Sequence, residues 1–304
     1  MQVDSKDFQL LAALYDDARQ SYLSLGRRVS LSAPSVRERL KHLQRHGILQ
    51  GFMLSLNPGV FGRDDLVLFF HGKNFTRRQV TKALAAPDVA WIGWKLDGGI
   101  TAGVWSQDRE QAVKDLTAVL GTTPSGQAFT EGHILRPLSL IDLSLIDALI
   151  DNPRMLLDEL IDSTKLSPKT VRKHLQQLIQ KETIFIEPRL GALTDSGDLV
   201  YQIAVAGRIS MGDVRRIMGQ AVLLHNTQEP PIKYLLCWGS DLSDVTTKTR
   251  ALQGLPGVES ATISLNKELL ISTDFEHWLI HKEISRLKKA RMLGGFIETR
   301  ALSY

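Results

Sequence analysis

Three short stretches near the N-terminus place apolar side chains three or four positions apart. The stripes are Leu10, Leu11 and Leu14, then Leu23 and Val29, then Val36, Leu40 and Leu43. This spacing is typical of amphipathic helices that each bury one face. Ser32 is suited to cap the third helix, and Gly47 can end it in the left-handed conformation. Residues 48–56 alternate loosely up to the turn at Asn57, so they predict a strand, and three helices with a wing make a winged helix-turn-helix.

The same pattern returns 135 residues further along the chain without a gap. Thirteen of the 37 positions from residue 7 to residue 43 are identical to those from 142 to 178. The identical polar pairs are Asp7 and Asp142, Asp16 and Asp151, Arg19 and Arg154, Ser32 and Ser167, Arg37 and Arg172. Shared leucine spacing does not explain identities at charged positions. The second half of the chain therefore repeats the first, beginning with a second winged helix-turn-helix.

Each helix-turn-helix is followed by the same order of strands and helices. After the first, we expect strands at 66–70, 89–95, 101–105 and 127–135, and helices at 76–85 and 108–120. After the second, we expect strands at 200–207, 222–225, 234–238 and 258–265, and helices at 212–219 and 241–252. The order βαββαβ is the split ferredoxin-like unit. An amphipathic helix at 275–293, with its apolar side at Trp278, Leu279, Ile284 and Leu287, is expected to dock on a neighbouring sheet or to mediate self-association.

The expected fold is therefore α+β, with two winged helix-turn-helix domains alternating with two ferredoxin-like domains. The expected boundaries are 1–63, 64–136, 137–192 and 193–270, with a helical extension at 271–304. An antiparallel sheet with one apolar face does not leave that face in water. We therefore expect the two ferredoxin-like units to pair with each other, within one chain or between chains.

Composition removes several classes of protein. One cysteine, Cys237, cannot form an internal disulfide, and no Cys and His cluster has zinc-finger spacing. Apolar runs are far shorter than the roughly 20 residues that span a bilayer, and the first eleven residues carry acids where a signal peptide is basic. We expect a cytoplasmic protein without a membrane segment, metal or cofactor.

The charge of the chain is concentrated in one place. The whole chain has a net charge of only +4, yet residues 27–46 hold six basic side chains against the single acid Glu38. The six are Arg27, Arg28, Arg37, Arg39, Lys41 and Arg45. A basic helix near the N-terminus is therefore expected.

One segment resembles a known family. Residues 31–40, Leu-Ser-Ala-Pro-Ser-Val-Arg-Glu-Arg-Leu, with Gly47-Ile48-Leu49 and Leu56-Asn57-Pro58, resemble the helix-turn-helix of the Lrp/AsnC transcription regulators. The βαββαβ units are similar, by element order, to that family's ligand-sensing and assembly domain. The resemblance implies a sequence-specific, non-enzymatic regulator of double-stranded DNA, with the third helix in the major groove. A tandem of two such units can act as a single-chain pseudo-dimer, and we also expect homo-oligomers.

The resemblance and the helical period together select candidate DNA-binding residues. Ser35, Arg37, Glu38 and His42 are candidates for base edges, with Ser32 at the helix start and Arg39 on its flank. Arg27, Arg28, Lys41 and Arg45 are candidates for phosphates. In the second copy the candidates are Lys169, Arg172 and Lys173.

The two copies differ in charge. Residues 1–63 carry nine basic and five acidic residues, whereas residues 138–190 carry seven and eight. His174 stands where the first copy has Arg39, and Glu182 where it has Gly47. The first helix-turn-helix is therefore expected to dominate DNA affinity.

A small-molecule effector site is suggested only weakly by the sequence. The candidate residues are Asp97, Gly98 and Gly99, where the family has a Gly-Asp-aromatic-Asp segment, but the glycines are shifted. The second copy has Gln228-Glu229-Pro230-Pro231 there, which does not resemble it. The other interpretation is that Asp97 makes a hairpin turn, and this is the one we favour.

Two further alternatives remain open. The same two-domain plan, sometimes in tandem, resembles the siroheme decarboxylases of heme biosynthesis, although the histidines and arginines that would line a tetrapyrrole pocket cannot be placed. His277 and His281 lie four apart on one expected helix but lack the glutamate of a zincin motif. We interpret that pair as a surface coincidence.

Overall fold

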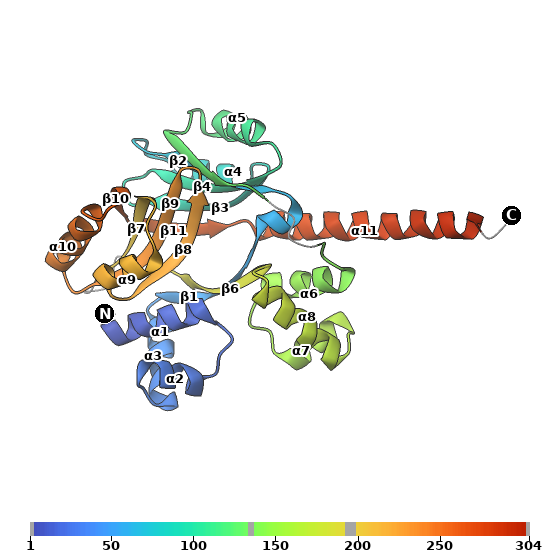
Figure 1. The fold of residues 1–304 in the computed structure, drawn as a ribbon, viewed down its shortest axis with the longest axis horizontal. Helices are drawn as coiled ribbons and strands as arrows, with labels where there is room; N and C mark the ends of the chain where they lie inside the picture. Colours follow the sequence, from blue (N-terminus) through green and yellow to red (C-terminus); the bar gives the residue numbers. More distant parts are fainter. Residues whose placement is uncertain (1–2, 133–136, 192–198, 302–304) are drawn as a thin grey trace.

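The computed structural model describes residues 3–132, 137–191 and 199–301, with side chains as far as residue 290. Two three-helix units lie side by side along one edge of the molecule, and two sheets with their covering helices lie above them (Figure 1). The α+β architecture expected from the repeat is confirmed.

The first helix-turn-helix consists of α1 (Ser5–Asp16), α2 (Tyr22–Val29) and α3 (Ala33–Arg45). Ser32 caps α3 as expected, because its Oγ accepts a hydrogen bond from the amide of Ser35 at 3.3 Å. The turn before α3 is tight. A Cβ on Gly26 would lie 2.4 Å from the carbonyl oxygen of Leu31, so only glycine lets α3 approach α2 this closely.

The second helix-turn-helix repeats this plan with α6 (Leu140–Asp151), α7 (Leu157–Thr164) and α8 (Pro168–Gln180). The cap of α8 is Ser167, whose Oγ accepts from the amide of Thr170 at 3.2 Å. The stripes of the third helices are buried in both units, Val36, Leu40 and Leu43 in the first and Val171, Leu175 and Leu178 in the second. The expectation for Leu23 is wrong, because Leu23 is 55% exposed and Leu25 takes the buried position on α2.

The expected wing takes a different form. Strand β1 (Leu49–Leu56) pairs antiparallel with β6 (Ile184–Leu190), the strand at the same place in the second copy. Phe52 lies opposite Pro188 and Met53 opposite Glu187. Adding 135 to one member of each pair gives a member of the other, so the ladder is symmetric about a local twofold axis. The two helix-turn-helix units are thus joined as the halves of an isologous dimer are joined.

The ladder also exchanges core residues between the two units. Leu54 and Leu56 of β1 pack in the cluster that contains α6, α7 and α8, while Leu190 of β6 packs against the core of the first unit. Arg19, which follows α1, reinforces the contact by donating to the carbonyl oxygens of Pro153 at 2.8 Å and Met155 at 2.7 Å. Neither helix-turn-helix completes its core alone.

Both ferredoxin-like units are present. The first comprises β2 (Asp64–Phe70), α4 (Arg77–Leu84), β3 (Val89–Lys95), β4 (Ile100–Ser106), α5 (Arg109–Leu120) and β5 (Gly126–Thr130). The second comprises β7 (Leu199–Gly207), α9 (Met211–Met218), β8 (Ala221–Gln228), β9 (Pro231–Gly239), α10 (Leu242–Gln253) and β10 (Val258–Ser264). Their strand orders, β3-β4-β2-β5 and β8-β9-β7-β10, are equivalent. The fourth strand of the first unit was expected to reach residue 135, but β5 ends at Thr130 and residues 131–132 are not in a strand. Residues 133–135 lie outside the described residues.

One strand was not expected from the sequence. Strand β11 (Asn266–Ile271) leaves the second unit and pairs antiparallel with β3, which makes the first sheet five-stranded. It is short, only partly buried and begins with the polar residues Asn266, Lys267 and Glu268, so its pattern does not mark it as a strand.

The two ferredoxin-like units pair within the chain, which confirms one of the two arrangements expected for their sheets. Phe129 and Glu229 exchange both backbone hydrogen bonds, at 2.9 and 3.0 Å. Between the units, the Phe69 and Tyr234 rings lie 6.4 Å apart and the Trp91 and His225 rings 6.2 Å apart. The two ferredoxin-like units of a single chain are therefore in direct contact through their sheets.

The C-terminal helix α11 (Thr273–Ala301) docks mainly on α6 rather than on a sheet, which corrects part of the expectation for residues 275–293. Leu279 and Ile280 are buried against the second helix-turn-helix core. Trp278 stays half-exposed and stacks on Phe275, with the guanidinium of Arg63 5.7 Å from its ring. The rest of α11 extends away from the body (Figure 1).

Two expectations from composition can be compared with the structure. Cys237 is buried, and burial raises the pKa of its thiol to about 12, so it is a poor nucleophile. Within the described ranges, no helix combines the length and the apolar character needed to cross a bilayer.

A carboxylate lies at the twofold axis of the β1–β6 ladder. Glu187 faces α1, and its Oε2 accepts a hydrogen bond from Ser55 Oγ at 3.1 Å. Burial raises the pKa of Glu187 to about 7, although the bond from Ser55 acts in the opposite direction. Burial and this nearby carboxylate also raise the pKa of Tyr15.

We therefore expect Glu187→Gln to stabilise the protein at pH 8. The folded state holds a proton on Glu187 up to about pH 7, whereas an unfolded glutamate loses it near pH 4.3. Stability is therefore lost as the pH rises between these values, and the loss persists above pH 7. The gain from the amide should be at most about 4 kcal/mol at pH 8 and vanish near pH 4.5.

Urea unfolding at both pH values measures this difference. The exposed Glu259→Gln on β10 is the matched control, and its effect should be small at both. Equal stability of Glu187→Gln and the parent at pH 8 would contradict the idea that ionised Glu187 destabilises the folded protein.

Candidate nucleic-acid interface

The outer face of α3 carries free cationic side chains. Arg37 and Arg45 are exposed, and neither makes a direct ion pair with any described residue. Between them, Lys41 Nζ lies 3.1 Å from Glu38 Oε1, and the hydrogen bond from Lys41, together with its charge, lowers the pKa of Glu38. His42 is exposed beside His46, with ring centroids 4.3 Å apart. This face is positive and open to a ligand.

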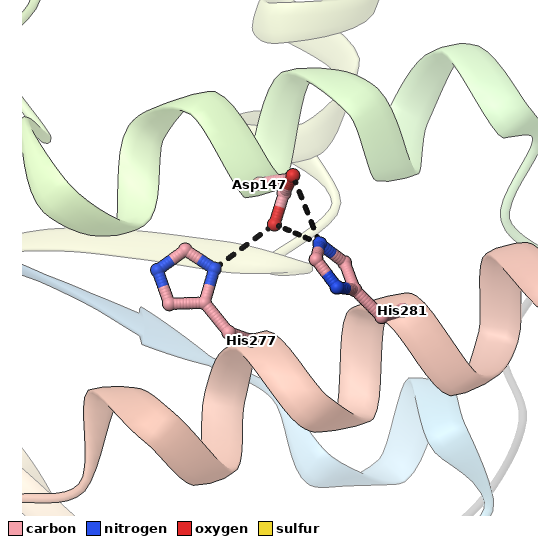
Figure 2. Close-up of side chains that lie close together, drawn as sticks. All are labelled: Asp147, His277 and His281. Atoms are coloured by element: carbon pink, nitrogen blue, oxygen red, sulfur yellow. Dashed lines mark hydrogen bonds and ion pairs between the residues drawn. The ribbon is translucent and has the colours of Figure 1, made fainter.

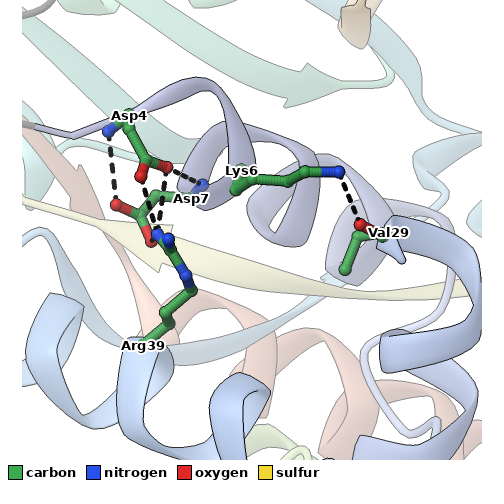
Figure 3. A network of polar contacts seen from close by, with 5 residues as sticks. All are labelled: Asp4, Lys6, Asp7, Val29 and Arg39. Carbon is green, nitrogen blue, oxygen red and sulfur yellow. Dashed lines mark hydrogen bonds and ion pairs between the residues drawn. The ribbon is translucent and has the colours of Figure 1, made fainter. Parts of the chain in front are cut away.

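Arg39 is turned away from that face, and its candidate role as a DNA contact needs correction. Its Nη1 donates to Asp4 Oδ2 at 2.9 Å and to Asp7 Oδ1 at 2.8 Å (Figure 3). The hydrogen bond to Asp7 raises the pKa of Arg39, although partial burial acts in the opposite direction. Asp7 is 4% exposed, so it needs this cation as a partner. Arg39 therefore fastens α3 to the start of α1.

The second copy makes the same contact with a different residue. His174, at the position of Arg39, has its Nδ1 2.8 Å from Asp142 Oδ1, and Asp142 is 1% exposed. The replacement of Arg39 by His174 therefore changes the partner of a buried acid within the domain and not a residue of the outer face. The sequence did contain a signal for this pair, because Asp7 and Asp142 recur identically within apolar stripes, where an acid is expensive unless paired.

The remaining first-copy candidates divide into free and engaged groups. Arg27 is exposed without an ion pair to a described residue, whereas Arg28 pairs with Asp16 at the end of α1. Ser32 is the cap of α3. Ser35 is half-buried in its first turn. Lys6, on α1, supports α2 by donating to the carbonyl oxygen of Val29 at 2.7 Å (Figure 3).

The outer face of α8 is at least as positive as that of α3. Lys169, Arg172 and Lys173 are all exposed and form no ion pairs with described residues. The helix contains no acidic residue, so the acids of this unit lie elsewhere. Arg39 is paired with Asp4 and Asp7, so it adds no free charge to the α3 face. The net charge of the whole second domain is therefore lower than the charge that the α8 face exposes to solvent.

The acids of the second unit gather on α7. Asp158, Glu159 and Asp162 are exposed there, and Asp162 occupies the position that Arg27 has on α2. In a helix-turn-helix the helix before the recognition helix crosses the DNA backbone. The two units therefore differ most in the helix that would meet phosphates.

The candidate effector residues form a turn. Asp97 Oδ1 accepts a hydrogen bond from the amide of Gly99 at 2.9 Å, and Gly98 has φ +84°. The carbonyl of Gly98 also accepts from the amide of Phe75 at 2.9 Å. The favoured interpretation, a hairpin turn between β3 and β4, describes their geometry.

Two hollows lie beside α1, away from the turn formed by Asp97, Gly98 and Gly99. They are lined by Gln9, Ala13, Asp16, Arg28, Val29 and Gln220, and by Ala12, Tyr15, Asp16, Glu187, Arg215, Gln220, Ala221, Val222 and Leu223. Neither lining includes a histidine, so neither offers the set of residues named above for a tetrapyrrole site.

Comparisons with known proteins agree with this geometry. The AsnC-type helix-turn-helix domain matches residues 3–44, and a winged helix-turn-helix DNA-binding domain matches residues 138–184. The chain is related to the Lrp/AsnC regulators. Relatives include the leucine-responsive regulatory protein of Rhizobium meliloti, 30% identical over 91 residues, which are 30% of this chain and 58% of that protein. The proline dehydrogenase transcriptional activator of Rhizobium radiobacter is 41% identical over 64 residues, 21% of this chain and 41% of that protein.

The chain spans about half the length of the curated relatives it matches. Among solved structures, the siroheme decarboxylase NirDL aligns with 93% of this chain and 100% of its own, at a TM-score of 0.47 and 12% identity. LrpC of Bacillus subtilis aligns with 46% of this chain and 99% of its own, at a TM-score of 0.32 and 21% identity.

Replacing Arg39 by Ala should destabilise the protein without selectively relaxing base specificity. The substitution leaves Asp7 buried and unpaired, and the loss of a charged hydrogen bond of this kind costs about 2 kcal/mol. Urea unfolding measures it. Arg45→Ala, on the same helix but exposed and without an ion pair, should change stability by less than about 0.5 kcal/mol. If both variants unfold at the same urea concentration, the Arg39–Asp7 contact does not hold the domain together.

Proposed function

We propose that the protein is a sequence-specific DNA-binding transcription regulator in which one chain supplies both halves of a pseudo-dimer. The observation that carries the proposal is the symmetric β1–β6 ladder, which joins two helix-turn-helix units whose α3 and α8 faces are both basic and exposed. Paired recognition helices related by a twofold axis suit two half-sites of opposite orientation. Its relatives are named as regulators, which agrees with a non-enzymatic role.

The proposed contacts follow from exposure and charge. Arg37 on α3 and Arg172 on α8 occupy the same position in the two copies and are assigned to base edges, where arginine pairs with guanine. Arg27, Arg45, Lys169 and Lys173 are assigned to phosphates. Lys41, Glu38 and His42 lie on the same α3 face and complete the proposed surface. The effector and the homo-oligomer remain predictions.

The decisive experiment selects bound sequences from random duplexes with the full chain and then measures affinity for the selected site. A regulator of this design should select two half-sites, and Arg37→Ala should weaken the selected site by about 1 to 3 kcal/mol. Arg45→Ala should weaken all duplexes alike and reduce the salt slope by about one. Arg216→Ala, an exposed position on α9 of the second ferredoxin-like unit, is the control. Failure to select any sequence would refute the proposal.

The acids on α7 are expected to weaken DNA binding by the second helix-turn-helix. Changing Asp158, Glu159 and Asp162 to their amides should strengthen DNA binding, because it removes repulsion from phosphates. The gain should shrink as salt rises, since exposed charges are screened within about 10 Å at 0.1 M salt. An equivalent change of the partly exposed Asp213 on α9 should leave DNA affinity unchanged. Unchanged affinity of the α7 variant at low salt would show that α7 does not face the DNA.

A further inference from the structure

The junction between α6 and α11 has an apolar seam and a polar edge. Along the seam, Leu279, Ile280 and Ile284 of α11 pack in the cluster that includes Leu143 and Ile146 of α6. Along the edge lie Asp147 and Asp151, one helical turn apart on α6, opposite His277 and His281, one turn apart on α11. Two elements separated by about 130 residues in sequence thus bring four side chains with ligand atoms together.

Three of these side chains converge closely. His277 Nδ1 lies 3.0 Å from Asp147 Oδ1, and His281 Nε2 lies 3.1 Å from the same oxygen (Figure 2). One ligand atom from each of the three residues lies within 4.8 Å of the other two. Residues four apart on a helix share one face, so both imidazoles reach the same point with the helix unchanged.

The fourth side chain occupies the position of a supporting residue. His277 directs Nδ1 toward Asp147 and its other nitrogen, Nε2, toward Asp151 Oδ1 at 3.3 Å. Histidines that ligate metals almost always donate their second ring N–H to a carboxylate, carbonyl or water, and this bond fixes the ring and the tautomer. Asp151 is thus placed to orient His277, an arrangement that a chance pair of surface histidines does not require.

We propose that Asp147, His277 and His281 bind one divalent transition-metal ion, with Asp151 holding His277 in position. Two imidazoles and one carboxylate suit zinc, nickel, cobalt or copper, whereas magnesium and calcium select oxygen ligands. Three protein ligands leave a coordination position for water. His281 is 64% exposed and gives the ion a route from solvent.

The proposal departs from the interpretation of the histidine pair as a surface coincidence. The pair taken alone has two ligands, and the third comes from α6, far away in the sequence, so no local motif reveals it. The closure of the site depends on α11 docking on α6, an arrangement that the apolar spacing of residues 275–293 did not specify.

The test uses the full chain without a polyhistidine tag, stripped of metal with a chelator. Zinc binding is followed by calorimetry, and cobalt binding by the visible absorption of the bound ion. We expect one equivalent of metal and a higher midpoint of thermal unfolding when zinc is present. His277→Ala and His281→Ala should abolish the tight equivalent, and Asp151→Asn should weaken it by about tenfold.

A matched control comes from α3. His42 near the end of α3 and His46 at its C-cap are also four apart and exposed, but no acid joins them in a three-ligand group among the described residues. The double change His42→Ala and His46→Ala should leave the single equivalent and its affinity intact. Loss of the metal in this variant, or its retention in His277→Ala, would overturn the proposal, as would a parent chain that binds no zinc or cobalt.

The histidine variants could lose α11 docking as well as a ligand, so a milder change is needed. Asp147→Asn keeps an oxygen that accepts hydrogen bonds from both imidazoles but removes the ligand charge. With its circular dichroism unchanged, this variant should lose the zinc-induced rise in the unfolding midpoint. A rise equal to that of the parent would place the ion elsewhere.

Discussion

The arrangement of the whole molecule depends on the antiparallel pairing of β1 with β6. Each strand leaves its own helix-turn-helix, crosses a local twofold axis and completes the apolar core of the other unit. An isolated two-stranded ladder is marginal in water, so this one needs the side chains that it inserts on both sides. Because pairing and core filling depend on one another, the two helix-turn-helix units have one relative orientation. The geometry of any DNA complex follows from that constraint.

Because the two copies are fused in one chain, their side chains can differ on the two sides of the axis. In a dimer of identical subunits, each substitution appears on both sides of the axis, whereas here each copy changes alone. The axis itself shows this, since Glu187 in the second copy corresponds to Phe52 in the first, which stacks under Arg154. The buried acid at the start of each first helix keeps a basic partner, Arg39 or His174, so the fold tolerates the divergence. The charge of α2 and α7, in contrast, differs in sign.

The sequence predicted the elements better than it predicted how they meet. Helical stripes, caps and the 135-residue repeat are local signals, and the helices and strands that they predicted are present, although β5 ends at Thr130, earlier than expected. The β1–β6 ladder joins residues about 130 apart, and two edge strands of similar pattern do not identify each other. Arg39 illustrates the same limit at the site, because the helical period places it on the flank of α3 but does not show that Asp4 and Asp7 reach it. Arg37, Arg45 and the basic face of α8 needed no such partner and were identifiable from local spacing.

The C-terminal helix connects the sheets to the second helix-turn-helix by a continuous series of contacts. Strand β11 pairs with β3, and the amide of Ser272 donates to the carbonyl oxygen of Ala90 at 2.8 Å just before α11 begins. The helix then packs on α6, which also contacts α7 and α8. The first helix-turn-helix has no corresponding α11 contact of this extent in the described residues. A ligand bound by His277 and His281 of α11 and by Asp147 of α6 would therefore strengthen the connection between the first sheet and the unit that contains α8. The unit that contains α3 is connected through β1 and β6. The position of the second recognition helix is thus set by two attachments, and only one of them is symmetric.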